Sequence, residues 1–150
     1  MQASKCLPIF FIAIVVAFYS CKKNNPAPQS VLIVGKWSVQ GDTSRQYING
    51  VVQSTYAVAG INSPYYQFNA DGSGTIKDNI GTPDLVANFT YTLSNGILTI
   101  DVPQQEADPY GSQVKYQIIK LTSNALILLW EENSPVPGDS NYKEYIYLTK

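Results

Sequence analysis

The sequence predicts an all-β domain whose strands pair antiparallel and close into a barrel. Three observations support this prediction. From residue 35 onward, short runs rich in β-branched and aromatic residues alternate with turn sequences. Several runs alternate apolar and polar residues with the period of two expected of a half-buried strand. Closing such a sheet on itself removes its exposed edges, which makes a barrel the expected form.

Eight or nine strand-like runs can be placed between the turn sequences. Asn49-Gly50 is a strong hairpin signal, because both residues tolerate the positive φ of a two-residue turn. No run has helical periodicity, apart from one turn at residues 31–34. The expected strands are residues 35–43, 51–59, 65–70, 74–79, 86–93, 96–102, 113–121, 125–132 and 142–149. Their order predicts a meander of antiparallel hairpins.

The run at residues 126–130 differs from the others, because it is apolar on both faces. One face can be buried in the barrel interior. The other face needs a separate cover, which we expect to be a neighbouring loop or a partner.

Length and composition limit the classes of protein that fit. A chain of 150 residues has a single-domain length. With 45% hydrophobic and 14% charged residues, it is not predominantly disordered. The formal net charge is −1 and there is no basic run, so neither nucleic acid nor an anionic membrane surface is an indicated partner.

The chain lacks the residues of the commonest catalytic sites. It has no histidine, which excludes Ser-His-Asp and Cys-His catalysis and histidine-ligated zinc. Its two cysteines, Cys6 and Cys21, lie in or beside the N-terminal apolar stretch, so the folded part has no thiolate nucleophile or thiolate metal site. The sequence therefore indicates no enzyme, no metal site and no cofactor.

Two acidic segments have a chemical interpretation beside a structural one. Residues 71–74 (Asp-Gly-Ser-Gly) lack the spaced oxygen ligands of a calcium loop, and we expect a hairpin with glycines at positive φ. Asp101, Glu106 and Asp108 could form a carboxylate pair or a weak cation site, although a solvated loop is the favoured interpretation.

Residues 1–20 have the form of a secretory signal. Lys5 gives the positive start, and the apolar run at residues 7–18 is shorter than the ~20 residues of a membrane-spanning helix. A membrane anchor helix is the alternative. It is disfavoured because Lys22-Lys23 and a polar segment follow at once.

The end of this segment, Ala17-Phe18-Tyr19-Ser20-Cys21, resembles a bacterial lipobox. This resemblance implies cleavage before Cys21 and lipidation of that cysteine, which anchors the protein stably in a membrane. An ordinary secretory signal with an incidental cysteine is the alternative. Residues 21–34 would then be the lipidated cysteine and a flexible tether. Lysines take the place of the acidic residues that favour surface export, so the periplasmic side of the outer membrane is the expected location.

Three motifs resemble the lipocalin-like domains of bacterial lipoproteins. They are an apolar turn leading into Gly35-Lys36-Trp37, the hairpin at residues 68–75 (Phe-Asn-Ala-Asp-Gly-Ser-Gly-Thr), and the late strand at residues 121–126. The resemblance implies an up-and-down barrel of about eight strands over residues 35–150, with Gly35 and Trp37 closing one end and an interior able to hold one small ligand. An arginine often stacks on this tryptophan near the end of lipocalin barrels. Lys143 or Lys150 is the expected substitute here.

The function expected from this resemblance is that of a cell-envelope lipoprotein binding a small hydrophobic or amphipathic ligand. Aromatic side chains offer an apolar body, and in tyrosine also a polar tip. The predicted pocket-lining residues are Tyr56, Phe89, Tyr91, Tyr116 and Trp130. The alternative is a protein-interaction module, such as an envelope inhibitor or accessory subunit. A carboxylate-dependent hydrolase is a third and weaker interpretation.

Overall fold

The computed structural model describes residues 27–59, 64–78, 85–103, 112–136 and 139–150. Within these ranges the chain forms one short helix and a series of antiparallel strands. No helix among these residues is long and apolar enough to cross a membrane. The elements are α1 (Gln29–Leu32), β1 (Gly35–Ile48), β2 (Val51–Ala59), β3 (Tyr65–Phe68), β4 (Ser73–Asp78), β5 (Leu85–Ser94), β6 (Ile97–Val102), β7 (Ser112–Leu121), β8 (Ala125–Glu132) and β9 (Ser140–Thr149).

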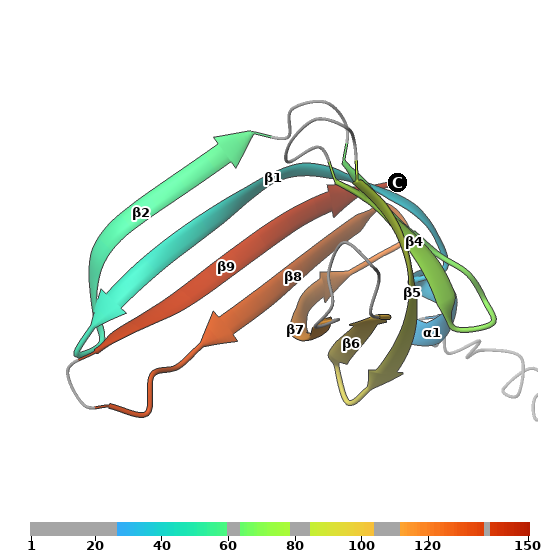
Figure 1. Ribbon diagram of the computed structural model, residues 1–150. Helices are drawn as coiled ribbons and strands as arrows, with labels where there is room; N and C mark the ends of the chain where they lie inside the picture. The colour runs from blue at the N-terminus through green and yellow to red at the C-terminus, as the bar shows by residue number, and fades with distance from the viewer. Residues whose placement is uncertain (1–26, 60–63, 79–84, 104–111, 137–138) are drawn as a thin grey trace, which may run out of the picture.

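The strands close into an eight-stranded barrel with one extra strand. β3 to β9 pair in sequence order, and β1 closes the ring by pairing with β3 on one edge and with β9 on the other. β2 lies outside this ring and pairs with β1 (Figure 1). The predicted fold class, an all-β antiparallel barrel of about eight strands, is confirmed.

The simple meander order is wrong at one place, because β1 is longer than expected. Its residues 35–38 pair with β3, and its residues 41–48 pair with β2 on the same edge. The strand therefore continues past residue 43 to the Asn49-Gly50 turn, where φ reaches 51° and 77°. β2 consequently branches away from the barrel instead of lying between β1 and β3.

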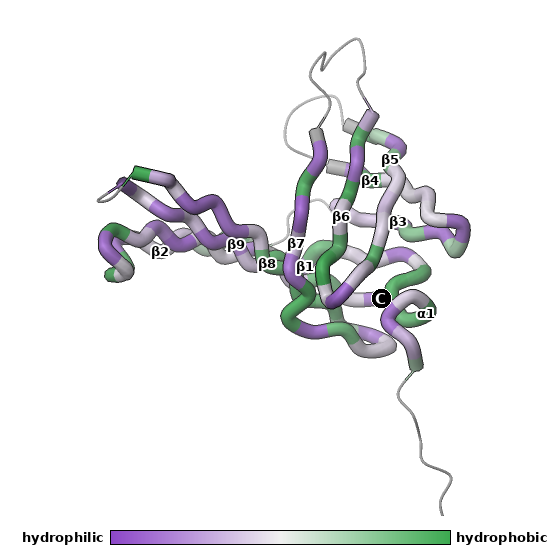
Figure 2. The backbone as a smooth tube through the Cα atoms, turned by 90° about the horizontal axis from the view of Figure 1, so that it is seen from below, coloured by the Kyte–Doolittle hydropathy of each residue, from purple (hydrophilic) through white to green (hydrophobic). Residues whose placement is uncertain are grey.

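The barrel wall is also incomplete between β7 and β8. These strands pair only where residues 117–121 meet residues 126–129. The other half of β7 pairs with β6, and the other half of β8 pairs with β9. The outer parts of β1, β8 and β9, together with the whole of β2, thus extend from the barrel as a curved sheet (Figures 1 and 2). We call this sheet the wing: residues 41–48 of β1, all of β2, residues 127–132 of β8 and residues 140–147 of β9.

The hydrophobic core fills the barrel and reaches the base of the wing at Leu128 and Ile146. Its side chains come from nearly every strand of the ring and from the segment after α1. Ile33 is fully buried and Val34 packs against the core, so the folded part begins before residue 35. The fully buried large side chains are Trp37, Phe68, Ile33, Leu98, Leu126, Leu128 and Leu148.

β8 has buried side chains on both of its faces. Leu126 and Leu128 belong to the core, as the alternation predicts. On the other face Leu129 lies between Gln117 of β7 and Tyr145 of β9 and is only 6% exposed. The second face of β8 is therefore buried at Leu129 and partly exposed at Ile127.

Candidate functional site

One end of the barrel is closed by Trp37. Its side chain is fully buried, and its Nε1 donates a hydrogen bond to the Ile33 carbonyl oxygen at 2.6 Å. Lys150 lies on the indole, with Nζ 4.7 Å from the ring centroid. The same ammonium donates to the carbonyl oxygens of Leu32 at 2.9 Å and Val34 at 2.8 Å. Lys150 thus occupies the position expected of the lipocalin arginine.

Gly35 is required at this end for two physical reasons. Its φ is +128°, a region that residues with a Cβ rarely adopt. A Cβ at this position would also lie 3.1 Å from Cε of Lys150. In the Gly-x-Trp motif, Gly35 therefore provides the backbone turn and the space for Lys150, and Trp37 fills the end of the barrel beneath that lysine.

Two of the predicted lining residues, Phe89 and Tyr91, belong to the packed wall next to this end. Phe89 is 2% exposed, and its ring lies 5.5 Å from that of Phe68 and 6.4 Å from that of Tyr91. The Tyr91 hydroxyl donates to the Asn69 carbonyl oxygen at 2.6 Å. A Cβ on Gly74 would come within 2.3 Å of the Phe89 ring, which shows how closely this region is packed.

The other three predicted residues lie toward the open end. Tyr116 of β7 packs against the core, Trp130 of β8 is half-buried, and Tyr56 of β2 is 70% exposed. The register joins Trp130 and Tyr56 into one row across the wing, with Glu144 of β9 and Ser44 of β1 between them. The row nearer the core consists of Leu128, Ile146, Asp42 and Val58, and the row farther out of Glu132, Tyr142, Gln46 and Ser54.

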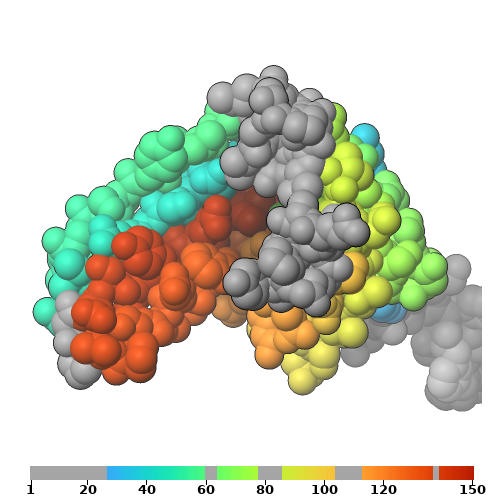
Figure 3. Space-filling view, viewed as in Figure 1, coloured from blue at the N-terminus to red at the C-terminus, as the bar shows by residue number. Residues whose placement is uncertain are grey.

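These three rows form the inner face of the wing, which continues the wall of the core. Leu128 and Ile146 belong both to the row nearest the core and to the core cluster itself. In the outermost row, Gln46 Nε2 donates to the Tyr142 hydroxyl at 3.1 Å, and Ser54 Oγ donates to Gln46 Oε1 at 3.3 Å. The face thus changes from apolar to polar with distance from the barrel, and the space-filling view shows the molecule hollowed beside β9 (Figure 3).

Ionisable side chains gather where the inner face joins the core. Burial raises the pKa of Glu144, and the negative charge of Asp42 raises it further. Burial also raises the pKa of Asp42. The pKa of Tyr116 is raised mainly by burial and also by Glu144, while a hydrogen bond with Tyr66 acts in the opposite direction. Partly desolvated carboxylates beside aromatic rings are a common property of binding sites.

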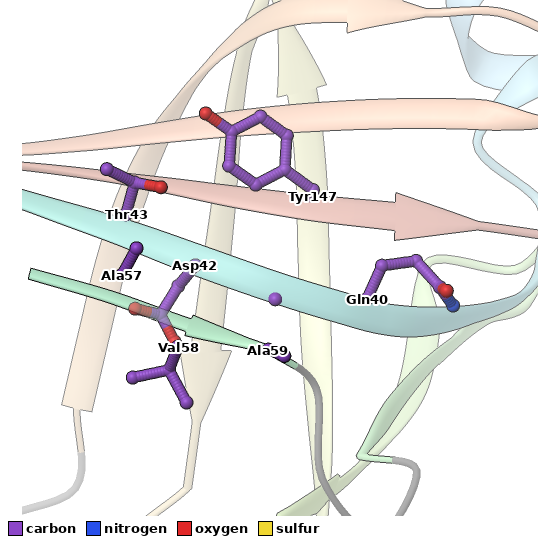
Figure 4. A pocket seen from close by; sticks show the side chains of 8 residues that line it. Gln40, Asp42, Thr43, Ala57, Val58, Ala59 and Tyr147 are labelled. Carbon is purple, nitrogen blue, oxygen red and sulfur yellow. The ribbon is translucent and has the colours of Figure 1, made fainter.

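A shallow groove runs along the junction of β1 and β2. It has a volume of about 340 Å³ and a mostly apolar lining. Three of its lining residues, Gly41, Ala57 and Ala59, have no side chain or only a methyl group, which leaves room for the groove. The side chains of Tyr147 and Asp42 lie on opposite sides of the groove (Figure 4). The remaining lining residues are Gln40, Thr43 and Val58.

The sequence analysis missed Asp42, Ser44 and Glu144. The alternation in the last strand places Glu144 on the same face as Ile146, so the information was present for that residue. Asp42 and Ser44 could not be placed, because the expected first strand ended at residue 43 and its pairing with β9 was unknown. Asp101 is exposed, whereas Glu106, Asp108 and Cys21 lie outside the described residues, as does the export segment.

Known proteins similar to this chain include one sequence family and two solved structures. No curated protein matches the chain. Similar solved structures include a lipocalin-like protein from Bacteroides uniformis ATCC 8492, with 19% identity over 75% of this chain and 94% of that one and a TM-score of 0.47. An uncharacterized protein from Bacteroides eggerthii DSM 20697 has 17% identity over 78% of this chain and 98% of that one, with a TM-score of 0.47. The family model described as a lipocalin-like domain matches residues 33–128, well over half of the sequence. The chain therefore belongs to the lipocalin-like domain family.

Proposed function

We propose that this protein is a lipid-anchored protein of the cell envelope that binds a small amphipathic molecule at the open end of its barrel. The barrel fold is consistent with binding of a small hydrophobic ligand. The observation that supports the site is the row Trp130–Glu144–Ser44–Tyr56, which lies directly beside the core residues Leu128 and Ile146. The proposal assigns no catalytic step to the protein.

The position of the ligand follows from which part of the barrel interior is already filled by side chains. Trp37, Phe68 and Phe89 occupy the closed half, so the ligand rests on the boundary between the core and the wing. Its apolar part contacts Tyr116 and Trp130. Its polar part lies near Glu144, where the inner face becomes polar.

The chemistry of the polar part follows from the two carboxylates. A partly buried carboxylate is stabilised by a hydrogen-bond donor or a positive charge and destabilised by another anion. Burial raises the pKa of both Asp42 and Glu144, so the charged form of each carboxylate is partly desolvated in the free protein. An amine or hydroxyl head group therefore suits the site better than a carboxylate.

Binding can be tested with two fluorescent long-chain probes that differ only in carrying an amine or a carboxylate. We expect saturable binding of the amine probe to a fragment of residues 27–150, which contains the whole described core. Trp130→Ala weakens binding by about tenfold, as loss of a half-buried aromatic contact would. Glu144→Gln reduces the preference for the amine. The matched control is Tyr147→Ala, on the opposite face of β9, which leaves binding unchanged.

The membrane anchor needs a separate test, because the binding site does not depend on it. The apolar run and the lipobox-like sequence before Cys21 support it. We expect wild-type chains to incorporate radiolabelled palmitate and to fractionate with membranes. Cys21→Ser should lose the label, whereas Cys6→Ser should keep it. A label that survives Cys21→Ser would contradict lipidation at this residue.

A further inference from the structure

β2 has one edge without a strand beside it. It pairs with β1 on one side, and the described part of the sheet has no strand on its other side (Figures 1 and 2). Outside the regular strand pairings, no backbone hydrogen bond among the described residues involves residues 51–59. The outward N–H and C=O groups of this edge form a template that another strand can extend.

This edge also lacks the usual protection against pairing. Proteins commonly place charged residues or proline on edge strands to prevent association. β2 has the sequence VVQSTYAVA, with no charge and no proline. It is also highly exposed, with Val51 at 62% and Tyr56 at 70%. Its one irregularity is a bulge at Gln53, which leaves residues 54–59 as a regular run.

We propose that two copies of this chain associate through β2, antiparallel across a twofold axis at Tyr56. A twofold axis perpendicular to the sheet keeps the inner faces of both wings on one side. Inner-face residues of one copy then lie opposite inner-face residues of the other: Tyr56 meets its own symmetry mate, and Ser54 meets Val58. On the outer face Thr55 meets Ala57.

We assign a second copy to this edge because the pairing brings no like charges together and places two exposed Tyr56 rings opposite each other. No charged residue of β2 meets a like charge across the axis, since the strand has none. The exposed Tyr56 rings form a cross-strand aromatic pair, one of the more favourable pairs in sheets. The row Trp130–Glu144–Ser44–Tyr56 would then continue into the same row of the second copy.

The test is a charge exchange at the axis, measured by sedimentation velocity of the full chain in density-matched detergent. We expect wild-type chains to form dimers between about 1 μM and about 100 μM, the range for an interface of modest area. Tyr56→Lys and Tyr56→Glu should each weaken self-association by about tenfold, through loss of the aromatic pair and like-charge repulsion. Mixing the two variants should restore dimers, because lysine then faces glutamate.

Controls separate this effect from misfolding. Ile97→Lys and Ile97→Glu place the same charges on an exposed apolar residue of β6, a strand with both edges paired, and should leave dimers intact. Thermal unfolding of the Tyr56 variants should match wild type, since the side chain is exposed. Wild-type chains that stay monomeric at every concentration would overturn the proposal. So would dimers that persist in Tyr56→Lys, or a foreign protein at equal stoichiometry in place of the second copy.

Discussion

Three strands, β1, β8 and β9, run from the packed end of the barrel into the wing, and the two regions differ in what these strands enclose. At the closed end, Trp37 is fully buried and both its ring and its Nε1 have partners. In the wing, the continuation of the same β1 strand presents Asp42, Ser44 and Gln46 on the equivalent face. The chain's second tryptophan, Trp130, is only half-buried there.

This difference indicates that the closed end contributes most of the packing energy, whereas the proposed ligand site lies at the open end. A packed interior gains free energy from each apolar contact and leaves no room for a ligand. The wing has partly desolvated carboxylates and exposed aromatic rings, which add little to stability and resemble the lining of a binding site. Paired substitutions at the two ends test this distinction.

The largest difference is expected between the two tryptophans. Trp37→Ala should lower the free energy of unfolding by about 4 kcal/mol, because it removes a fully buried ring and leaves a cavity. Trp130→Ala should lower it by about 1 kcal/mol, because that ring is only partly buried. Urea denaturation followed by far-UV circular dichroism measures both. Equal losses would mean that the wing is part of the stability core.

Two glycines give the next comparison. Gly74→Ala should destabilise by about 3 kcal/mol, because the new Cβ would meet the Phe89 ring and the Gln67 carbonyl oxygen. Gly50 has a positive φ of 77° with nothing within 4 Å of a Cβ, so Gly50→Ala should lose only about 1 kcal/mol through backbone strain. Thermal unfolding distinguishes them, and a harmless Gly74→Ala would show that the aromatic wall is loosely packed.

Substitutions of Lys150 and Lys143 should differ less in their effect on the free energy of unfolding. Lys150→Met removes two hydrogen bonds to carbonyl oxygens and a cation–π contact with Trp37, and should lower stability by about 1–2 kcal/mol. Lys143 pairs with Glu131 on the wing surface, and Lys143→Met should change stability by less than about 1 kcal/mol. The comparison is best made at low and high salt, since only the exposed pair should weaken strongly with salt.

The smallest effect, and the one most specific to the open end, concerns Glu144. Its folded-state pKa is raised above the usual 4.5, so the folded protein binds more protons than the unfolded chain between those two values. Stability contributed by this group is therefore lost as pH rises through that window. Glu144→Gln should be more stable than wild type at neutral pH and equal to it at acid pH. Destabilisation by this substitution at neutral pH would contradict the proposed desolvation.

Strand positions were predictable because turn chemistry and alternation are local properties. The Asn49-Gly50 turn adopts the positive φ that its sequence predicts, and Asn95 and Gly96 likewise have positive φ. Gly74 is a partial exception. Gly72 has the expected positive φ of 87°, but Gly74 does not, and its lack of a Cβ makes room for Phe89 instead.

The branching of β2 and the shape of the site were not predictable in this way. They depend on which strand occupies the second edge of β1, and β2 and β3 share that edge. Of the predicted lining residues, Phe89 and Tyr91 lie in the packed wall, while Trp130 and Tyr56 share a row that only the register reveals. The pairing of Asp42 with β9 is likewise a long-range property.

The most direct test of the ligand site uses the two tryptophans as separate reporters. Trp37→Phe leaves Trp130 as the only tryptophan, and Trp130→Phe leaves Trp37. Each variant is titrated with a long-chain amine that carries bromine atoms near its head group, which quench indole fluorescence on contact. A ligand at the open end should quench Trp130 saturably and leave Trp37 almost unchanged. Quenching of Trp37 alone, or no saturable quenching of Trp130, would contradict a binding site between the core and the wing.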